Sequence, residues 1–180
     1  MPDKTHASFF RRFVLLALCA MAISVFLPHT SRAQSPEAVK QAMALLKAKT
    51  AKLGAPAVKG EDAVAGKQVP TLYFGATKMN NNFAVVDEVK QEMGGTATLF
   101  VKSGDDFVRV ATNVQKNDGS RAVGTVLDPN GKAIAAIRGG GAYYGEAEIL
   151  GKTYVTGYEP IHDPSGAIIG IYYVGYQKAQ

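Results

Sequence analysis

The chain has 180 residues, a single cysteine and a formal net charge of +5. Cys19 and four of the basic residues lie within the first 33 positions, and the rest of the chain is close to neutral with no thiol. A disulfide, a thiolate nucleophile and a zinc–sulfur site are therefore excluded beyond that segment. Apart from Lys47, Lys49 and Lys52 the basic residues are scattered, which argues against a nucleic-acid partner.

The first 33 residues have the three parts of a secretory signal peptide. Lys4 and Arg11-Arg12 precede an uncharged apolar run over 13–27, and Ser31-Arg32-Ala33 places small residues at the −3 and −1 positions of a cut. The run is shorter than the roughly 20 residues that a membrane-spanning helix needs. We expect cleavage after Ala33, which makes the product, Gln34 to Gln180, periplasmic or secreted; the alternative is an uncleaved anchor.

The N-terminal half of the remaining chain predicts two helices. Ser35-Pro36 is a good helix start, and a moderately amphipathic pattern follows it as far as Gly54. Residues 54–68 are rich in Ala, Gly, Lys and Asp and predict a loop or weakly structured connection, and 69–74 predict a short strand. Apolar residues at helical spacing over 83–93 then predict a second helix that Gly94-Gly95 ends.

The C-terminal half changes to the pattern of strands separated by Gly, Asp and Asn turns. Strands are expected over 96–101, 107–114, 122–127, 144–149, 152–158 and 167–177, with a short helix over 133–137. The chain is therefore assigned to the α+β class, with helices covering an antiparallel sheet.

Several ordered segments together resemble the Cache domain of extracytoplasmic sensors, in the Cache 3/Cache 2 fusion type found in methyl-accepting chemotaxis receptors. The resemblance covers roughly residues 69–176, and it depends on the order of the pieces rather than on any one of them. The segments are Phe83-Ala84-Val85-Val86-Asp87, Gly94 to Phe100, Asp105 to Asn113, Asp118 to Thr125, Gly145 to Pro160, Ile169-Gly170-Ile171 and Val174-Gly175.

The resemblance implies a PAS-like fold with a central antiparallel sheet, a long N-terminal helix, further short helices and a ligand pocket over the sheet. It divides the chain into a signal peptide (1–33), a helix with its connection (34–68) and a sensor domain (69–180). Receptors of this family continue into a transmembrane helix, whereas this sequence ends at Gln180. A solitary binding protein that works with a membrane receptor, or that self-associates, is expected.

Arg109 is the strongest candidate for ligand recognition. It lies inside an apolar strand, where alternation places it on one face with Phe107 and Ala111. A buried charge needs a partner, and a guanidinium presents a planar fork suited to a carboxylate. The alternatives are a sheet face open to water, or a structural ion pair with one of three acids: Glu146, Glu148 or Glu159.

Tyrosines crowd the last third of the chain, and we expect Tyr144, Tyr154 and Tyr158 to line the walls of the pocket near Arg109. Tyr154 and Tyr158 share one strand face with Thr156. A tyrosine offers a large apolar body and a hydroxyl that can orient a ligand. The alternative is that these rings form ordinary cross-strand pairs in the sheet.

Other chemistry is poorly supported by the sequence. His162 is the only histidine after the predicted signal peptide, and no serine lies in a Gly-x-Ser-x-Gly turn, so neither a metal site nor a hydrolase triad is expected. We therefore predict a non-enzymatic protein without a cofactor that binds a small organic ligand such as a carboxylate for sensing. The alternative is a protein–protein adaptor without a ligand of its own.

Overall fold

The computed structural model describes residues 35–179, so the predicted signal peptide and its cleavage site lie outside the described residues. Three helices and two antiparallel sheets make up this part of the chain, which confirms the α+β assignment. The elements are α1 (Pro36–Ala51), β1 (Pro56–Val64), β2 (Lys67–Phe74), β3 (Thr77–Lys78), α2 (Ala84–Met93), β4 (Thr96–Ser103), β5 (Asp106–Thr112), α3 (Lys132–Arg138), β6 (Tyr143–Ile149), β7 (Lys152–His162) and β8 (Ile168–Gln177).

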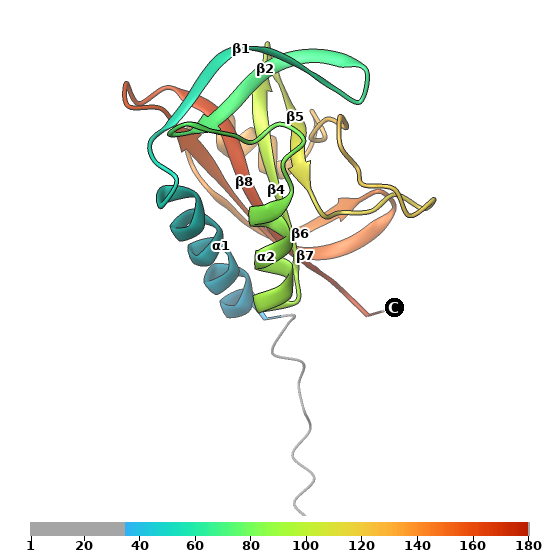
Figure 1. Ribbon diagram of the computed structural model, residues 1–180. Helices are drawn as coiled ribbons and strands as arrows, with labels where there is room; N and C mark the ends of the chain where they lie inside the picture. Colours follow the sequence, from blue (N-terminus) through green and yellow to red (C-terminus); the bar gives the residue numbers. More distant parts are fainter. Residues whose placement is uncertain (1–34, 180) are drawn as a thin grey trace, which may run out of the picture.

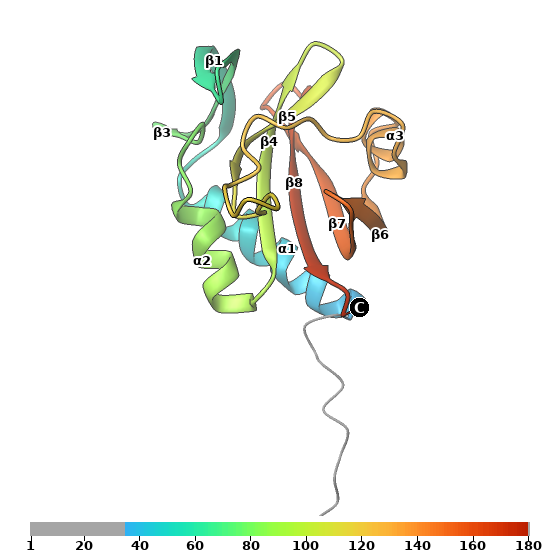
Figure 2. The same ribbon diagram turned by 90° about the vertical axis from the view of Figure 1, so that its right-hand side faces the viewer.

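The central sheet has the strand order β5-β4-β8-β7-β6, and a smaller sheet of order β1-β2-β3 lies at one end of it (Figure 1). The long helix α1 and the shorter α2 cover one face of the central sheet, and α3 lies on the other side (Figure 2). This is the PAS-like arrangement that the sequence predicted. No helix within residues 35–179 is both long and apolar enough to cross a bilayer.

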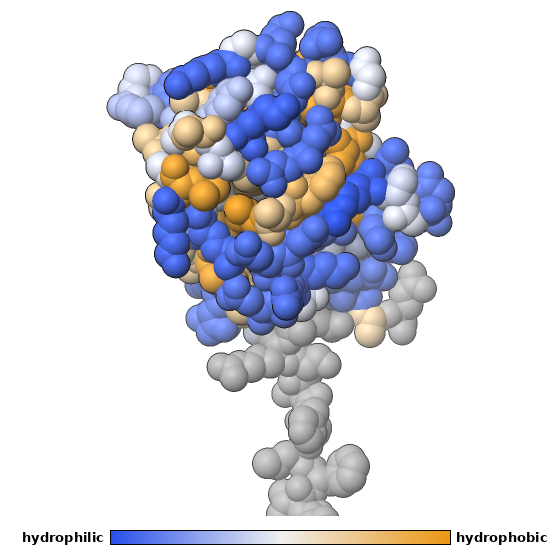
Figure 3. Space-filling view, in the orientation of Figure 1, coloured by the Kyte–Doolittle hydropathy of each residue, from blue (hydrophilic) through white to orange (hydrophobic). Residues whose placement is uncertain are grey.

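Helix α1 begins where the sequence predicted. The Ser35 hydroxyl accepts a hydrogen bond from the backbone N–H of Ala38, and Pro36 occupies the first turn. Its apolar stripe, which includes Val39, Met43 and Leu46, is fully buried against the sheet. Its outer surface is polar, and the helix-covered side of the molecule is mostly hydrophilic where α1 and α2 lie (Figure 3).

The prediction of a loop over 54–68 is wrong, because most of this segment forms β1 and the start of β2. The two strands pair from Pro56↔Phe74 to Val64↔Lys67, and Ala65-Gly66 makes the turn with positive φ at both residues. Most of β1 is exposed, with a register shift between Val58 and Glu61. Because its residues are mostly polar, β1 lacks the alternation of apolar and polar residues by which strands are usually recognised.

The strand expected over 122–127 is also wrong, although this segment does lie along the open edge of β5. It makes only an isolated bridge, between Val108 and Val126. Gly124 interrupts the extended conformation, with a φ of 77°. Backbone hydrogen bonds still join the segment to β5: the Arg109 N–H donates to the Thr125 carbonyl, and the Gly124 N–H donates to the Arg109 carbonyl, each at 2.9 Å.

The core is divided by the central sheet into two clusters. The larger one contains the buried faces of α1 and α2, the small sheet, and residues such as Leu99 and Val174 from the central sheet. The second lies under α3 and contains Phe100, Tyr158 and Tyr173. A β-bulge between β4 and β5 pairs Leu99 with Ala111 but Phe100 with Arg109, and it decides which side each β5 residue faces.

Candidate ligand-binding site

A pocket of about 350 Å³ opens on the α3 side of the central sheet. Its walls come from β5, from the segment that leads into α3, and from β6 and β7. The lining residues are Arg109, Val126, Leu127, Asp128, Gly131, Lys132, Ala133, Tyr143, Glu146, Ala147, Glu148, Ile149, Leu150 and Tyr158. Five of these residues are charged: Arg109, Asp128, Lys132, Glu146 and Glu148. Concave sites of this size are typical of small-molecule binding.

Arg109 lies in the pocket wall with only 4% of its surface exposed. Its guanidinium packs over the Phe100 ring, 4.9 Å from the centroid, and its Nη1 donates to the Thr125 hydroxyl at 2.7 Å. Its Nε is buried and has no hydrogen-bond partner within residues 35–179. Burial disfavours the charged form and lowers the pKa of Arg109, an effect that the nearby Tyr158 and Tyr173 partly oppose.

Neither alternative expected for Arg109 is what the structure shows. The face is not open to water, and within residues 35–179 Arg109 forms no ion pair. Glu159 instead binds Lys47, and Glu146 binds Lys178. The guanidinium is therefore buried without an ion-pair partner among residues 35–179, although three exposed acidic residues, Asp128, Glu146 and Glu148, line the same pocket.

The predicted sharing of a face by Phe107, Arg109 and Ala111 holds only in part. Phe107 lies in the α3-side cluster, on the side where Arg109 faces Phe100, but Ala111 lies in the opposite cluster. The bulge inserts Val110 between the paired positions, which breaks simple alternation. The sequence offered no clear signal of that extra residue.

Tyr158 is brought together with Arg109, as expected. It is buried in the pocket wall, and its ring packs between Tyr143 at 6.2 Å and Tyr173 at 4.9 Å. Within residues 35–179 its hydroxyl has no hydrogen-bond partner, whereas that of Tyr173 is bonded to Thr96. Desolvation raises the pKa of Tyr158 well above its ordinary value, so this hydroxyl remains a donor.

Tyr154 lies on the same face of β7 as Tyr158 but behind the pocket rather than in its lining. Its hydroxyl is 3.4 Å from the Gln177 side-chain oxygen. Burial raises the pKa of Tyr154, and the positive charge of the nearby Arg109 partly opposes this rise. Tyr154 therefore supports the wall of the pocket.

The structure does not bring Tyr144 together with Arg109. Tyr144 follows Tyr143 in β6, and because successive side chains alternate, it lies on the α1 side of the sheet. There its ring packs over Gly157, close to Val39 of α1, and its hydroxyl donates to Glu159. Its neighbour Tyr143 lines the pocket instead. The sequence therefore indicated the two adjacent tyrosines, but not which of them faces the pocket.

Two pocket residues, Asp128 and Lys132, were not expected from the sequence to belong to the site. Asp128 lies at the exposed start of the α3 segment, close enough to influence the pKa of Tyr158. Lys132 is the first residue of α3 and is also exposed. They lie in a turn and at a helix start, where polar residues are common because they suit the local backbone. Their residue types therefore did not point to a binding site.

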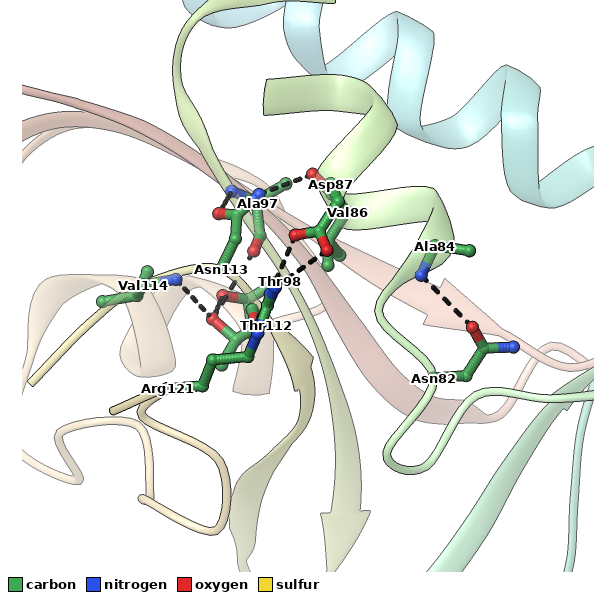
Figure 4. Close-up of polar contacts among 10 residues, drawn as sticks. All are labelled: Asn82, Ala84, Val86, Asp87, Ala97, Thr98, Thr112, Asn113, Val114 and Arg121. Atoms are coloured by element: carbon green, nitrogen blue, oxygen red, sulfur yellow. Dashed lines mark hydrogen bonds and ion pairs between the residues drawn. The ribbon is translucent and has the colours of Figure 1, made fainter. Parts of the chain in front are cut away.

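Residues 113–131 connect β5 to α3 and cover the pocket; this covering segment is anchored near its beginning to the rest of the fold (Figure 4). The Asn113 side chain accepts from the Ala97 N–H at 2.8 Å and donates to the Val86 carbonyl at 2.5 Å. Arg121 makes a bidentate pair with Asp87 of α2, with both distances 2.8 Å. These contacts hold the covering segment in one position relative to α2 and β4.

Metal and histidine chemistry gain no support from the described part of the chain. Residues 35–179 contain no group of three His, Cys, Asp or Glu residues placed to hold a metal ion. His162 is an exposed residue at the end of β7, away from the pocket lining. Among the described residues, the pocket therefore offers one buried cation, two tyrosine rings, the Tyr158 hydroxyl and four exposed charged side chains. These four belong to Asp128, Lys132, Glu146 and Glu148.

Comparison with known families identifies the class of protein that this fold and pocket belong to. The model of the Cache 3/Cache 2 fusion domain matches residues 29–180, and the chain belongs to that family. The match extends further toward the N-terminus than the segments by which the sequence resembled the family. Cache domains are extracytoplasmic sensor modules that bind small molecules. No curated protein matches the chain.

Proposed function

We propose that this protein senses a small organic anion, in the first place a carboxylate, in the pocket on the α3 side of the sheet. The observation that carries the proposal is Arg109, which lines the pocket with an almost fully buried guanidinium that forms no ion pair within residues 35–179. A buried charge without a counter-ion costs free energy, and an anionic ligand offsets that cost.

The geometry around Arg109 favours a carboxylate. A guanidinium presents parallel N–H donors that match the two oxygens of a carboxylate, and one of its donors is already fixed on Thr125. The Tyr158 hydroxyl, which has no partner within the described residues, is a further donor in the same wall. The volume of about 350 Å³ limits the ligand to a small molecule.

The biological setting follows from the family. We propose that the protein acts in the periplasm or after secretion, and that it passes the bound state to a membrane receptor or to a second copy of itself, in chemotaxis or another signalling response. The adaptor role without a ligand would be favoured by a pocket filled with the protein's own side chains. An open pocket with a free charge favours the ligand-binding role instead.

Thermal shift and isothermal titration calorimetry test the proposal on the protein from Gln34 onward. The probes are acetate, butyrate, succinate and 2-oxoglutarate, and butyramide and succinamide are the uncharged counterparts of butyrate and succinate. A ligand that binds only the folded state stabilises it, by about 2.7 kcal/mol when the ligand concentration is 100 times its dissociation constant. The melting temperature rises as a result. We expect a response to at least one acid and none to the amides.

Substitution of Arg109 assigns the response to the pocket. Arg109→Ala should remove binding of the responding acid without unfolding the protein, and Arg109→Lys should restore only part of it, because an ammonium lacks the planar fork. Arg138→Ala, which removes an exposed arginine of α3 outside the pocket lining, is the matched control. Unchanged affinity in Arg109→Ala would refute the assignment.

A further inference from the structure

The hydrogen bonding of Arg109 singles out one residue of the covering segment. A guanidinium has five N–H donors, and within residues 35–179 its only hydrogen-bond partner is the Thr125 hydroxyl, 2.7 Å from Nη1. The guanidinium also packs over the Phe100 ring. The orientation of the buried charge in the pocket wall therefore depends on Thr125.

The Thr125 hydroxyl can only accept from Arg109, because a guanidinium has no acceptor, and its own proton is used elsewhere. It donates to the Ala122 carbonyl at 2.8 Å. Thr125 thus gives Arg109 a fixed acceptor that carries no charge. An Asp or Glu in the same place would neutralise the guanidinium from within the protein and remove its need for an anion.

Thr125 is itself held in place on both sides. Its carbonyl accepts from the Arg109 N–H, so the side chain and the backbone of Arg109 both bind this one residue. The preceding Gly124 lies against the tip of the β1–β2 hairpin, where a Cβ would come within 2.5 Å of the Ala65 Cβ. The segment cannot move away from Arg109 without breaking these contacts.

We propose that Thr125 is a positioning residue that sets the specificity of the pocket for anions: it fixes the guanidinium of Arg109 and, because it is neutral, leaves the charge for the ligand to neutralise. This inference rests on the proposed function for its role in binding, but it also makes a prediction about the protein without any ligand. A carboxylate placed at position 125 should act as a built-in counter-ion.

The test compares Thr125→Asp with its uncharged match Thr125→Asn, and with Thr125→Ser. Without ligand at pH 7, Thr125→Asp should melt at a higher temperature than Thr125→Asn. A carboxylate beside Arg109 has its pKa lowered, so this advantage is complete above the ordinary value of about 3.9 and is lost as the pH falls through the lowered value. A merely structural role of Thr125 would not give this pH profile.

Binding of butyrate and succinate supplies the second measurement. Thr125→Asp should weaken binding of the responding acid by about tenfold or more, because the new carboxylate binds the Arg109 guanidinium in place of the ligand. The affinity of Thr125→Ser should stay within about threefold of that of the unsubstituted protein. Thr125→Val keeps the shape but removes the acceptor. It should weaken binding too, and it keeps the test valid where the Asp variant does not fold.

The outcomes separate this inference from the proposed function. If Thr125→Asp and Thr125→Asn melt alike at every pH, or if Thr125→Asp or Thr125→Val binds the acid as the unsubstituted protein does, the role of Thr125 is overturned. If no carboxylate binds the unsubstituted protein but the Asp variant shows the pH-dependent advantage, the positioning of Arg109 by Thr125 stands and the carboxylate function fails.

Discussion

The two faces of the central sheet are built from the same strands but serve different purposes. On the α1 and α2 side, side chains such as Leu46, Leu99 and Val174 pack into the larger of the two buried clusters. On the α3 side, a short helix and a long covering segment leave a pocket, and β5 turns a charged residue into it. The first face holds the fold together. Under the proposed function, the second face carries a cost in stability that an anionic ligand would recover.

The difference between the faces arises from small sequence features. Helix α1 presents an unbroken apolar stripe, so it packs tightly along the sheet. Helix α3 has only two turns and buries Ala133, Ile134 and Ile137, which cover part of the opposite face and leave the region near Arg109 and Tyr158 open. Stability and recognition should therefore respond separately to substitutions on the two faces.

The largest expected effect is on the closed face. Leu46→Ala removes a fully buried side chain between α1 and the sheet, and a cavity there should cost about 2–5 kcal/mol in the free energy of unfolding. Urea denaturation measures it, and the control is Val58→Ala, at an exposed site of β1 outside both the core and the pocket. In the folded fraction of Leu46→Ala, affinity for the responding acid should be unchanged; a large loss of affinity would mean that the two faces are coupled.

A matched pair of tyrosines on the pocket side sharpens the comparison. The Tyr173 hydroxyl is bonded to Thr96 at 3.1 Å, so Tyr173→Phe should cost about 1 kcal/mol of stability. Tyr158→Phe removes a hydroxyl without a partner in the described protein, and its stability should change by less than about 0.5 kcal/mol. Titration with the responding acid should show the reverse order, with the greater loss of affinity in Tyr158→Phe. Equal losses in both assays would contradict the role given to Tyr158.

The smallest expected effect is on the pH dependence of stability, and it involves Glu159. Burial alone would raise the pKa of Glu159, but hydrogen bonds from Lys47 and Tyr144 outweigh it, and the pKa lies below its ordinary value. The stability from this carboxylate is present above the ordinary pKa and is lost as the pH falls through the lowered one. Glu159→Gln should therefore flatten the dependence of the melting temperature on pH below about 4.3. A slope identical to that of the unsubstituted protein would remove Glu159 from the account.

Much of the fold could be predicted because local signals agreed with the final packing. Ser35-Pro36 and Gly94 mark helix ends that the structure confirms, and the short helix before Gly139 is present as α3. The strands that failed are those whose pattern depends on partners. Segment 56–64 is mostly exposed and forms a strand by pairing with β2, and segment 122–127 lies against β5 but is interrupted at Gly124.

The site was predictable only in its chemistry. A charged residue within an apolar strand pointed to Arg109, and tyrosine enrichment pointed to the strands β6 and β7 that line the pocket. The bulge opposite Leu99 and Phe100 decides which way β5 residues face, and alternation in β6 puts Tyr143 rather than Tyr144 in the pocket. Thr125 binds Arg109 across a loop, and such a contact between distant residues leaves no local pattern in the sequence.

The most direct test of the central claim is to replace Arg109 with Met and to measure stability and binding on the same preparation. A flexible apolar side chain of similar length removes the buried uncompensated charge, and such replacements are often neutral or stabilising by about 1–4 kcal/mol. We predict that Arg109→Met unfolds at the same or a higher urea concentration than the unsubstituted protein and no longer responds to any carboxylate. A variant that is clearly less stable, or that still binds the responding acid, would contradict the view that this charge is kept for a ligand.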